Sequence, residues 1–262
     1  MSTGTPPCAL TIAGSDSGGG AGIQADLKTF AALGVHGLSA ITAVTAQNTR
    51  GVRAIHPVPL KHLRTQLDAL FEDFPVAAVK TGMLGDARAV QLVARELGRR
   101  KPAWLIVDPV MIATSGARLL DRGAVRVLRD ELVPLADVLT PNLPEAEALL
   151  GTRIWNARDI ERAAQALLDL GPASVLLKGG HARGKEVLDL FVDRRGMSAM
   201  RHPRLEVQAH GTGCTLSAAM SAELAMGATP RAAARRATRF VQRALRRAYR
   251  PGSGGLHVLR GR

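Results

Sequence analysis

A glycine-rich segment that opens a helix offers a backbone site for an anion. The segment reads HGTGCTLSAAM, with Gly211 and Gly213 around a threonine, Cys214 directly after them, and small apolar residues beyond. Backbone N–H groups at a helix start have no partner within the helix and meet the positive end of its dipole. They can therefore stabilise charge that develops on a phosphoryl group during transfer. We interpret this segment as a candidate anion hole, against the alternative of a tight turn with glycines for packing.

The two cysteines of the chain do not form a metal or disulfide pattern. Cys8 and Cys214 show no C-x-x-C spacing and no clustering with histidine, so neither a zinc site nor a disulfide framework is indicated. Cys8 starts an apolar run and is interpreted as a small core residue. Cys214 lies at a predicted helix start with Lys178 expected nearby, and we expect its pKa to lie below the unperturbed value of about 8.5.

Polar side chains that follow predicted strands suit a nucleotide site. Lys178 in LLKGGH offers a cation for phosphates, although a surface lysine in a turn is the alternative. Asp108 in VDPVM and Glu145 in TPNLPEAEALL offer the oxygen ligands that Mg²⁺ takes, usually through water. Asn142 and Glu145 stand three residues apart at a helix start, so they can equally be a capping box.

Two common nucleotide-binding motifs are excluded. The segment 20–25 satisfies G-x-G-x-x-G/A, but a dinucleotide site needs an acidic residue about 20 positions later. No Asp or Glu occurs between Asp26 and Asp68, and the G-K-[ST] ending of a P-loop is absent. We prefer a glycine-rich loop that lets a ligand approach the backbone. A kinase with this sequence must hold phosphate by another device.

Apolar runs alternate with helical patterns along the chain, and this order predicts a parallel sheet covered on both faces. Strands are expected at 9–14, 38–44, 76–82, 104–108, 138–142 and 174–180, with further short strands between 186 and 207. Helices are expected at 23–33, 60–74, 87–97, 124–132, 143–149, 160–170, 215–226 and 232–248. No linker or repeat divides residues 1–262, so we expect one α/β domain. Ligands of such sheets bind at the carboxyl ends of the strands, where the polar residues above fall.

Composition limits the remaining classes of function. The chain has 262 residues, a net charge of +13 and only 3% aromatic residues. It contains no apolar run near the roughly 18 residues of a membrane span, and no secretory signal is visible, so a cytoplasmic protein without membrane contact is expected. Six arginines near the C-terminus recur at the spacing of one helical face: Arg235, Arg239, Arg243, Arg246, Arg247 and Arg250. We interpret them as the solvated face of an amphipathic helix. A nucleic-acid binder is the alternative, but stacking aromatics and a recognition motif are missing, so no specific nucleic acid is expected.

Seven segments taken together resemble one enzyme family. AGSDSGGGAGIQADLKTF, AVTAQNTRGV, KTGML, VDPVM, TPNLPEAEALL, LLKGGH and HGTGCTLSAA are similar to the hydroxymethylpyrimidine and phosphomethylpyrimidine kinases of thiamine biosynthesis. The resemblance implies a ribokinase-like fold with three α/β/α layers and a central, mainly parallel sheet. It also implies a homodimer, Mg²⁺ with ATP as phosphoryl donor, and two successive phosphorylations. These convert 4-amino-5-hydroxymethyl-2-methylpyrimidine to its monophosphate and then to its diphosphate.

The resemblance also assigns roles to individual residues. The implied substrate residues are Gln47, which reads the pyrimidine, and Gly14, Asp26, Met83 and Val110 around it; the implied nucleotide and catalytic residues are Asp108, Asn142, Glu145, Lys178, Gly211, Gly213 and Cys214. A glutamine amide suits an aminopyrimidine, because it can accept from the amino group and donate to the adjacent ring nitrogen. Asp108 and Glu145 match the positions for Mg²⁺ and phosphate, with the metal ion held through water. Cys214 stands where the broader group of ribokinase-like kinases usually has an aspartate that acts as the base. A pyridoxal or pyridoxine kinase of the same fold is the alternative.

Overall fold

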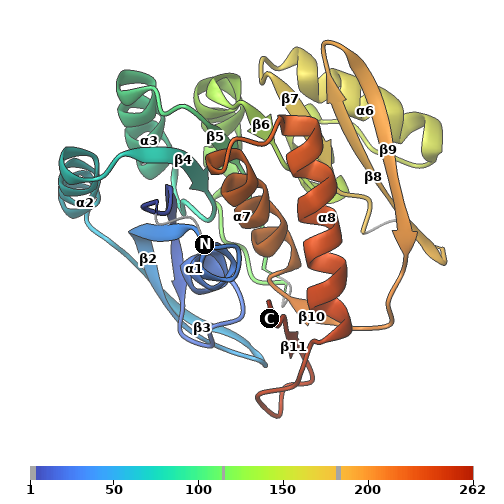
Figure 1. The fold of residues 1–262 in the computed structure, drawn as a ribbon, viewed down its shortest axis with the longest axis horizontal. Coiled ribbons are helices and arrows are strands. Elements are labelled where there is room, and N and C mark those ends of the chain that lie inside the picture. Colours follow the sequence, from blue (N-terminus) through green and yellow to red (C-terminus); the bar gives the residue numbers. More distant parts are fainter. Residues whose placement is uncertain (1–3, 114–115, 181–183, 262) are drawn as a thin grey trace.

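The central sheet is the frame on which the site is built. The computed structural model describes residues 4–113, 116–180 and 184–261. Within them, nine strands pair in the order β3-β2-β1-β4-β5-β6-β7-β8-β9 (Figure 1). Their bounds are β1 Cys8–Asp16, β2 His36–Asn48, β3 Gly51–Pro57, β4 Val76–Thr81, β5 Leu105–Val107, β6 Val138–Leu139, β7 Ser174–Leu177, β8 Glu186–Asp193 and β9 Gly196–Pro203. Neighbours among the six inner strands β2, β1, β4, β5, β6 and β7 pair in parallel. The pairs β2 with β3, β7 with β8 and β8 with β9, towards the two edges, are antiparallel. The expected mainly parallel sheet is confirmed.

Helices cover both faces of the sheet, which gives the three layers that the resemblance implies. One face carries α1 Gly22–Ala32, α7 Thr212–Ala225 and α8 Pro230–Arg246; the other carries α2 Leu60–Asp73, α3 Ala87–Arg100, α4 Arg122–Val127, α5 Leu143–Leu150 and α6 Ala157–Asp169. Figure 1 shows α7 and α8 in front of the sheet. Successive residues of a buried strand point to opposite faces of the sheet and so belong to different cores. Ile106 packs with the α7 and α8 side chains, whereas Val107 packs with those of α2 to α6. This double burial explains why the inner strands read as continuous apolar runs.

Helices and inner strands lie close to the predicted positions, and the differences are at ends and edges. The helix after the HGTGC segment starts at Thr212, three residues before the predicted start at Thr215. A single turn of π-helix at Leu128–Leu132 and a 3₁₀ turn at Val133–Leu135 follow α4. Strand β3 was not predicted, and neither was the short parallel pair of β10 Ala209–His210 with β11 His257–Val258. This pair ties the C-terminal segment to the residues that precede α7.

Two simpler interpretations are confirmed. Cys8 begins β1 and is buried. The six arginines of the C-terminal region are all exposed, while the opposite face of α8 is buried through Ala233, Ala237, Phe240 and Val241. This is the amphipathic pattern of a helix that covers a core. Among the described residues, no helix combines the length and apolar character that crossing a bilayer requires.

Candidate active site

The start of α7 has the backbone geometry that the predicted anion hole requires. Gly211 is the N-cap with a φ of 74°, and a Cβ at this position would lie 2.0 Å from the carbonyl oxygen of Gly20. Only glycine fits such a conformation and approach. No described side chain caps the helix, and the first bond within it runs from Thr215 N–H to Gly211 C=O at 2.9 Å. The N–H groups of residues 212–214 therefore lack a helical partner.

Lys178 lies directly beside this helix start. A Cβ at Gly213 would be 3.1 Å from the Lys178 Nζ atom. Lys178 follows β7, where it forms a parallel bridge with Asn142 after β6. Strands far apart in sequence thus bring Lys178, Gly211 and Gly213 together at the carboxyl edge of the sheet. His181 of the predicted Lys-Gly-Gly-His turn lies outside the described residues.

Two buried carboxylates share the Lys178 ammonium. Its Nζ atom lies 2.8 Å from Asp108 Oδ1 and 3.9 Å from Glu145 Oε2. Burial raises the pKa of Asp108, but Lys178 and Lys80 outweigh it and hold this pKa below the ordinary value. Burial raises the pKa of Glu145 to about 7, against the opposing effect of Lys178. Asp108 is therefore an ionised acceptor near neutral pH, whereas the pKa of Glu145 lies well above the ordinary value for a glutamate.

Ser217 belongs to this group, although sequence reasoning did not single it out. Its Oγ atom donates to Asp108 Oδ2 at 2.9 Å, from the second turn of α7. Thr140 Oγ1 lies 3.3 Å from Asp108 Oδ1. These contacts fix the carboxylate against both α7 and the end of β6. The small-residue run after Cys214 was the available signal, but it does not distinguish a packing serine from this one.

The carboxylates fit a metal ion that is held through water. Asn142 and Glu145 form a capping box, with Glu145 N–H donating to Asn142 Oδ1 at 2.9 Å and Asn142 N–H donating to Glu145 Oε2 at 2.8 Å. The capping alternative for this pair is thus confirmed. Both Asp108 oxygens already accept hydrogen bonds. Among the described residues, no three or more His, Cys, Asp or Glu side chains converge as a metal cage. The set suits Mg²⁺, which keeps several waters and takes few carboxylates.

Cys214 differs from its predicted chemistry. The thiol is half-buried in the first turn of α7, and the Gly22 N–H at the start of α1 donates toward its sulfur. Burial raises its pKa to about 11; the Lys80 ammonium opposes this, and the Asp26 and Asp108 carboxylates add to it. The expectation of a lowered pKa is therefore wrong for the free protein. The cation that acts most strongly on the thiol is Lys80, not Lys178.

Lys80 and Asp26 form a buried ion pair beneath the site. Both side chains are fully buried, with Lys80 Nζ 2.8 Å from Asp26 Oδ2. Thr11 Oγ1 donates to the same oxygen at 2.6 Å. Asp26, expected near the substrate, thus faces the interior rather than an open pocket. A lysine within the apolar run VAAVKTG is the sequence signal for such a buried pair.

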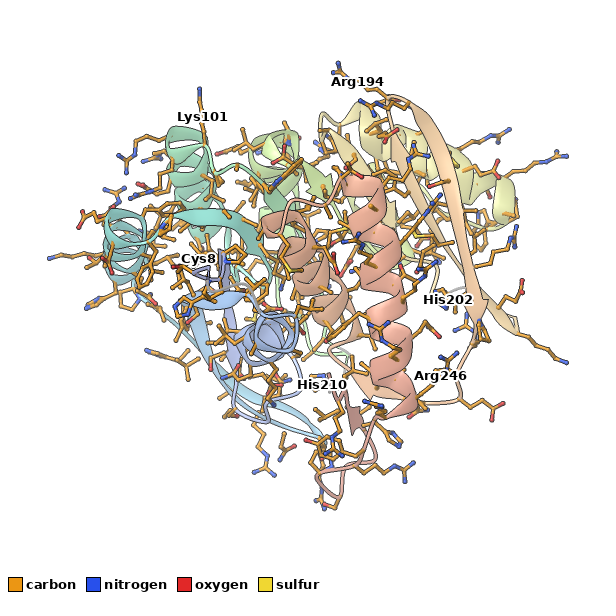
Figure 2. All side chains as sticks on the ribbon, in the orientation of Figure 1. Cys8, Lys101, Arg194, His202, His210 and Arg246 are labelled. Carbon is orange, nitrogen blue, oxygen red and sulfur yellow. The ribbon has the colours of Figure 1, made fainter. Side chains whose placement is uncertain are left out.

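Gln47 belongs to a second polar network, which lies around His210. The side-chain nitrogen of Gln47 is 2.9 Å from His210 Nε2, and this ring atom is 3.0 Å from Asp16 Oδ2. Figure 2 shows His210 between α1 and the lower part of α8. The Asp16 carboxylate also accepts N–H bonds from Gly18, Gly20 and Ala21 at 2.8 to 2.9 Å. Those N–H groups of the glycine-rich loop are therefore engaged by Asp16.

The remaining predicted substrate residues lie near the ends of β1, β4 and β5. A Cβ at Gly14 would be 2.9 Å from the Met83 sulfur, so the two residues are in contact. Thr42 Oγ1 donates to the Met83 carbonyl at 2.7 Å. Val110 is half-buried, and its N–H donates to the Asp108 carbonyl at 2.8 Å.

The sequence model of phosphomethylpyrimidine kinase matches residues 16–258. The chain belongs to the phosphomethylpyrimidine kinase family. It is 50% identical over 251 residues to a hydroxymethylpyrimidine/phosphomethylpyrimidine kinase of Haemophilus influenzae, covering 94% of this chain and 93% of that protein. It is 49% identical to a thiamine biosynthesis bifunctional protein of Geobacter sulfurreducens, of which it spans 50% of the length.

Solved structures place the family among kinases of ribokinase-like fold. An ADP complex of Bacillus subtilis pyridoxal kinase superposes with a TM-score of 0.92 at 34% identity, covering 98% of both chains. A phosphomethylpyrimidine kinase of Clostridium difficile superposes with a TM-score of 0.82 at 43% identity, covering 91% of this chain and 99% of that one. The fold is thus common to both kinds of kinase, while sequence identity is higher to the phosphomethylpyrimidine kinase.

Proposed function

We propose that this protein transfers phosphoryl groups from ATP to 4-amino-5-hydroxymethyl-2-methylpyrimidine and then to the resulting monophosphate. The observation that supports this proposal most directly is the position of the Lys178 ammonium at the uncapped start of α7. The Asp108 and Glu145 carboxylates lie within 4.0 Å of it. A cation, free N–H groups and carboxylates for a metal ion are the parts that phosphoryl transfer requires. The names of the relatives supply the substrate class.

In the proposed reaction, the protein acts mainly by placing charge. Lys178 and the N–H groups of residues 212–214 bind the γ-phosphoryl group and stabilise the charge that develops on its oxygens. Asp108 and Glu145 hold Mg²⁺ through water, and the ion supplies further neutralisation of the phosphates. Ser217 keeps the Asp108 carboxylate in place through its 2.9 Å hydrogen bond.

Only the first phosphorylation releases a proton from the attacking group. The substrate hydroxyl must lose its proton, whereas the monophosphate is already largely ionised near pH 7. We assign the acceptance of this proton to Cys214. Because the thiol is neutral in the free protein, this role requires that it lose its proton before the transfer, and the Lys80 and Lys178 ammonium groups are the nearby cations that favour the thiolate. The alternative is a thiol that only fills space beside the anion hole.

A pyridoxal kinase is the second candidate, and the TM-score of 0.92 to the Bacillus subtilis enzyme is the observation that favours it. Pyridoxal has no 4-amino group, so it leaves part of the Gln47 amide unpaired. The sequence identities of 50% and 43% to pyrimidine kinases exceed the 34% to the pyridoxal kinase. We therefore keep the pyrimidine reaction as the principal proposal.

The proposal also covers the domain organisation, the cellular location and the oligomeric state. We infer one kinase domain over residues 1–262, a cytoplasmic location and a homodimer. The exposed edge strand β3 supports the dimer, because an unpaired strand edge readily pairs with another chain. The proposed partners are small molecules, namely the aminopyrimidine, its phosphate and ATP, and the proposed function includes no specific nucleic acid.

Product analysis tests the two-step activity. Purified protein with Mg²⁺ and ATP is incubated with the hydroxymethyl aminopyrimidine, and phosphorus NMR follows the products. The proposal predicts that a monophosphate appears first and a diphosphate replaces it. A reaction that stops at the monophosphate while ATP remains would contradict the second step, and no product would contradict both.

A further inference from the structure

His210 contacts the glycine-rich loop, Gln47 and the C-terminal strand β11, and the proposed reaction gives it no role. It stands one residue before the Gly211 N-cap, and its backbone pairs with Val258 of β11. Its ring lies against the glycine-rich loop, where a Cβ at Gly20 would be 2.4 Å from His210 Cδ2. The side chain is buried, so its polar contacts decide its orientation.

The contact with Asp16 fixes the proton on His210. Asp16 is 3% exposed, and its carboxylate can only accept. Burial raises the pKa of Asp16, but the hydrogen bonds from His210 and from the loop N–H groups outweigh it, so the pKa lies below the ordinary value. The 3.0 Å contact with an ionised carboxylate therefore requires a proton on Nε2. A protonated imidazolium carries the same Nε2 proton, so this conclusion holds for both charge states of the ring.

The same proton determines how the Gln47 amide is turned. The structure turns the Gln47 side-chain nitrogen toward His210 Nε2 at 2.9 Å, which sets two donors against each other once Nε2 carries a proton. The two orientations of a carboxamide occupy the same space, so its hydrogen bonds decide between them. The turned amide accepts from Nε2, which then shares its one proton between Gln47 and Asp16 Oδ2. A carboxamide has one acceptor atom, so the favourable orientation puts Oε1 against His210. The amide NH₂ then faces away from His210, and Oε1 keeps one lone pair.

We propose that His210 is a positioning residue that holds the Gln47 amide in one of its two orientations, with the NH₂ group presented to the substrate ring. This inference rests on the proposed function for the identity of the ring. The substrate must then carry an acceptor, such as a pyrimidine nitrogen, opposite this NH₂ group. A preset amide loses less entropy when the substrate binds than one free to turn.

Affinity for the hydroxymethyl aminopyrimidine without nucleotide is the first test, because it leaves the anion hole out of the measurement. Calorimetry compares wild type with Gln47→Leu, His210→Phe, His210→Gln and the double variant Gln47→Leu/His210→Phe. Each of the first two is expected to weaken binding by about 10-fold or more. His210→Gln places an NH₂ group near the position of Nε2, so it should stay within about 3-fold of wild type. The exposed His62 provides the matched control His62→Phe, which should not change affinity.

The double variant separates positioning from a merely structural role. If His210 acts through Gln47, adding His210→Phe to Gln47→Leu causes no further loss of affinity. Losses that multiply, or a His210→Phe variant that binds like wild type, would overturn the proposal. Should His210→Phe fail to fold, His210→Gln still decides, because a full 10-fold loss there contradicts donation from this position.

Nitrogen NMR of the histidine rings tests the inference independently of substrate. We expect His210 to carry a proton on Nε2 across the pH range in which the protein is folded. A neutral ring with its proton on Nδ1 would refute the proposed orientation. If wild type binds no aminopyrimidine, the proposed function fails while the NMR result still judges the His210 contact.

Discussion

Lys178 Nζ lies 2.8 Å from Asp108 Oδ1, and neither side chain is appreciably exposed. Each charge is therefore kept in the interior by the other, at the point where α7 presents its free N–H groups. Removing either partner leaves the other buried without compensation, so the pair has both a structural and a chemical consequence. An incoming phosphate can take over part of the Lys178 interaction, which couples binding to the ion pair.

We predict that Lys178→Ala and Asp108→Asn each lower kcat by about 10²-fold or more, since they act on phosphoryl charge and on metal placement. ADP should still bind. Steady-state kinetics at saturating Mg²⁺ and ATP, together with ADP titration, measure both. The exposed Lys61 of α2 supplies the control Lys61→Ala, which should behave as wild type. Wild-type kcat in either site variant would remove that residue from the proposed role.

Cys214 should affect the two phosphorylations unequally if it accepts the hydroxyl proton. Cys214→Ala is then expected to slow the first step by about 10²-fold or more and the second much less, with Cys214→Asp partly restoring the first. Single-turnover rates for each step across pH give the comparison. Equal slowing of both steps, with no gain from aspartate, would support the space-filling alternative instead.

The raised pKa of the Cys214 thiol can be measured directly in the free protein. An acid with a raised pKa stays neutral to higher pH, so alkylation by iodoacetamide should be slow at pH 7.5 and should accelerate up to about pH 11. Because Cys8 is buried, Cys214→Ala identifies the reacting thiol. A titration midpoint below 9 would show that burial does not dominate this site.

The Lys80 and Asp26 pair should matter for stability. Lys80→Met leaves the Asp26 carboxylate buried and unpaired, which costs about 3–5 kcal/mol of unfolding free energy. The double variant Lys80→Met/Asp26→Leu should recover much of this loss, because two apolar side chains replace two charges. Urea denaturation of the two single variants and the double variant gives the comparison. Additive losses would mean that the pair is not a coupled unit.

Much of the fold is predictable from local patterns, while the contacts of the site are not. Apolar runs located the inner strands because those strands are buried on both faces, and helical periodicity located the long helices. Strand β3 was missed because residues 51–57 are an exposed edge with no apolar run. The two-residue strands β10 and β11 are too short for any period.

The predicted anion hole follows from local sequence, but the polar networks depend on distant residues. Asp16 and His210 are 194 positions apart, and Lys80 reaches Asp26 across 54. Nothing in the local sequence shows those distances or the burial that raises the Cys214 pKa. The expectation for the thiol failed for this reason, since it considered the helix N-terminus and Lys178 without the cost of burial or the carboxylates nearby.

Substrate preference tests the central claim most directly. The measurement is kcat/KM for the hydroxymethyl aminopyrimidine, its monophosphate, pyridoxal and pyridoxine under one set of conditions with Mg²⁺ and ATP. The account predicts that both pyrimidines are phosphorylated and that the aminopyrimidine exceeds pyridoxal by about 10²-fold or more, because pyridoxal leaves the Gln47 amide partly unpaired. A higher kcat/KM for pyridoxal than for the aminopyrimidine would contradict the account.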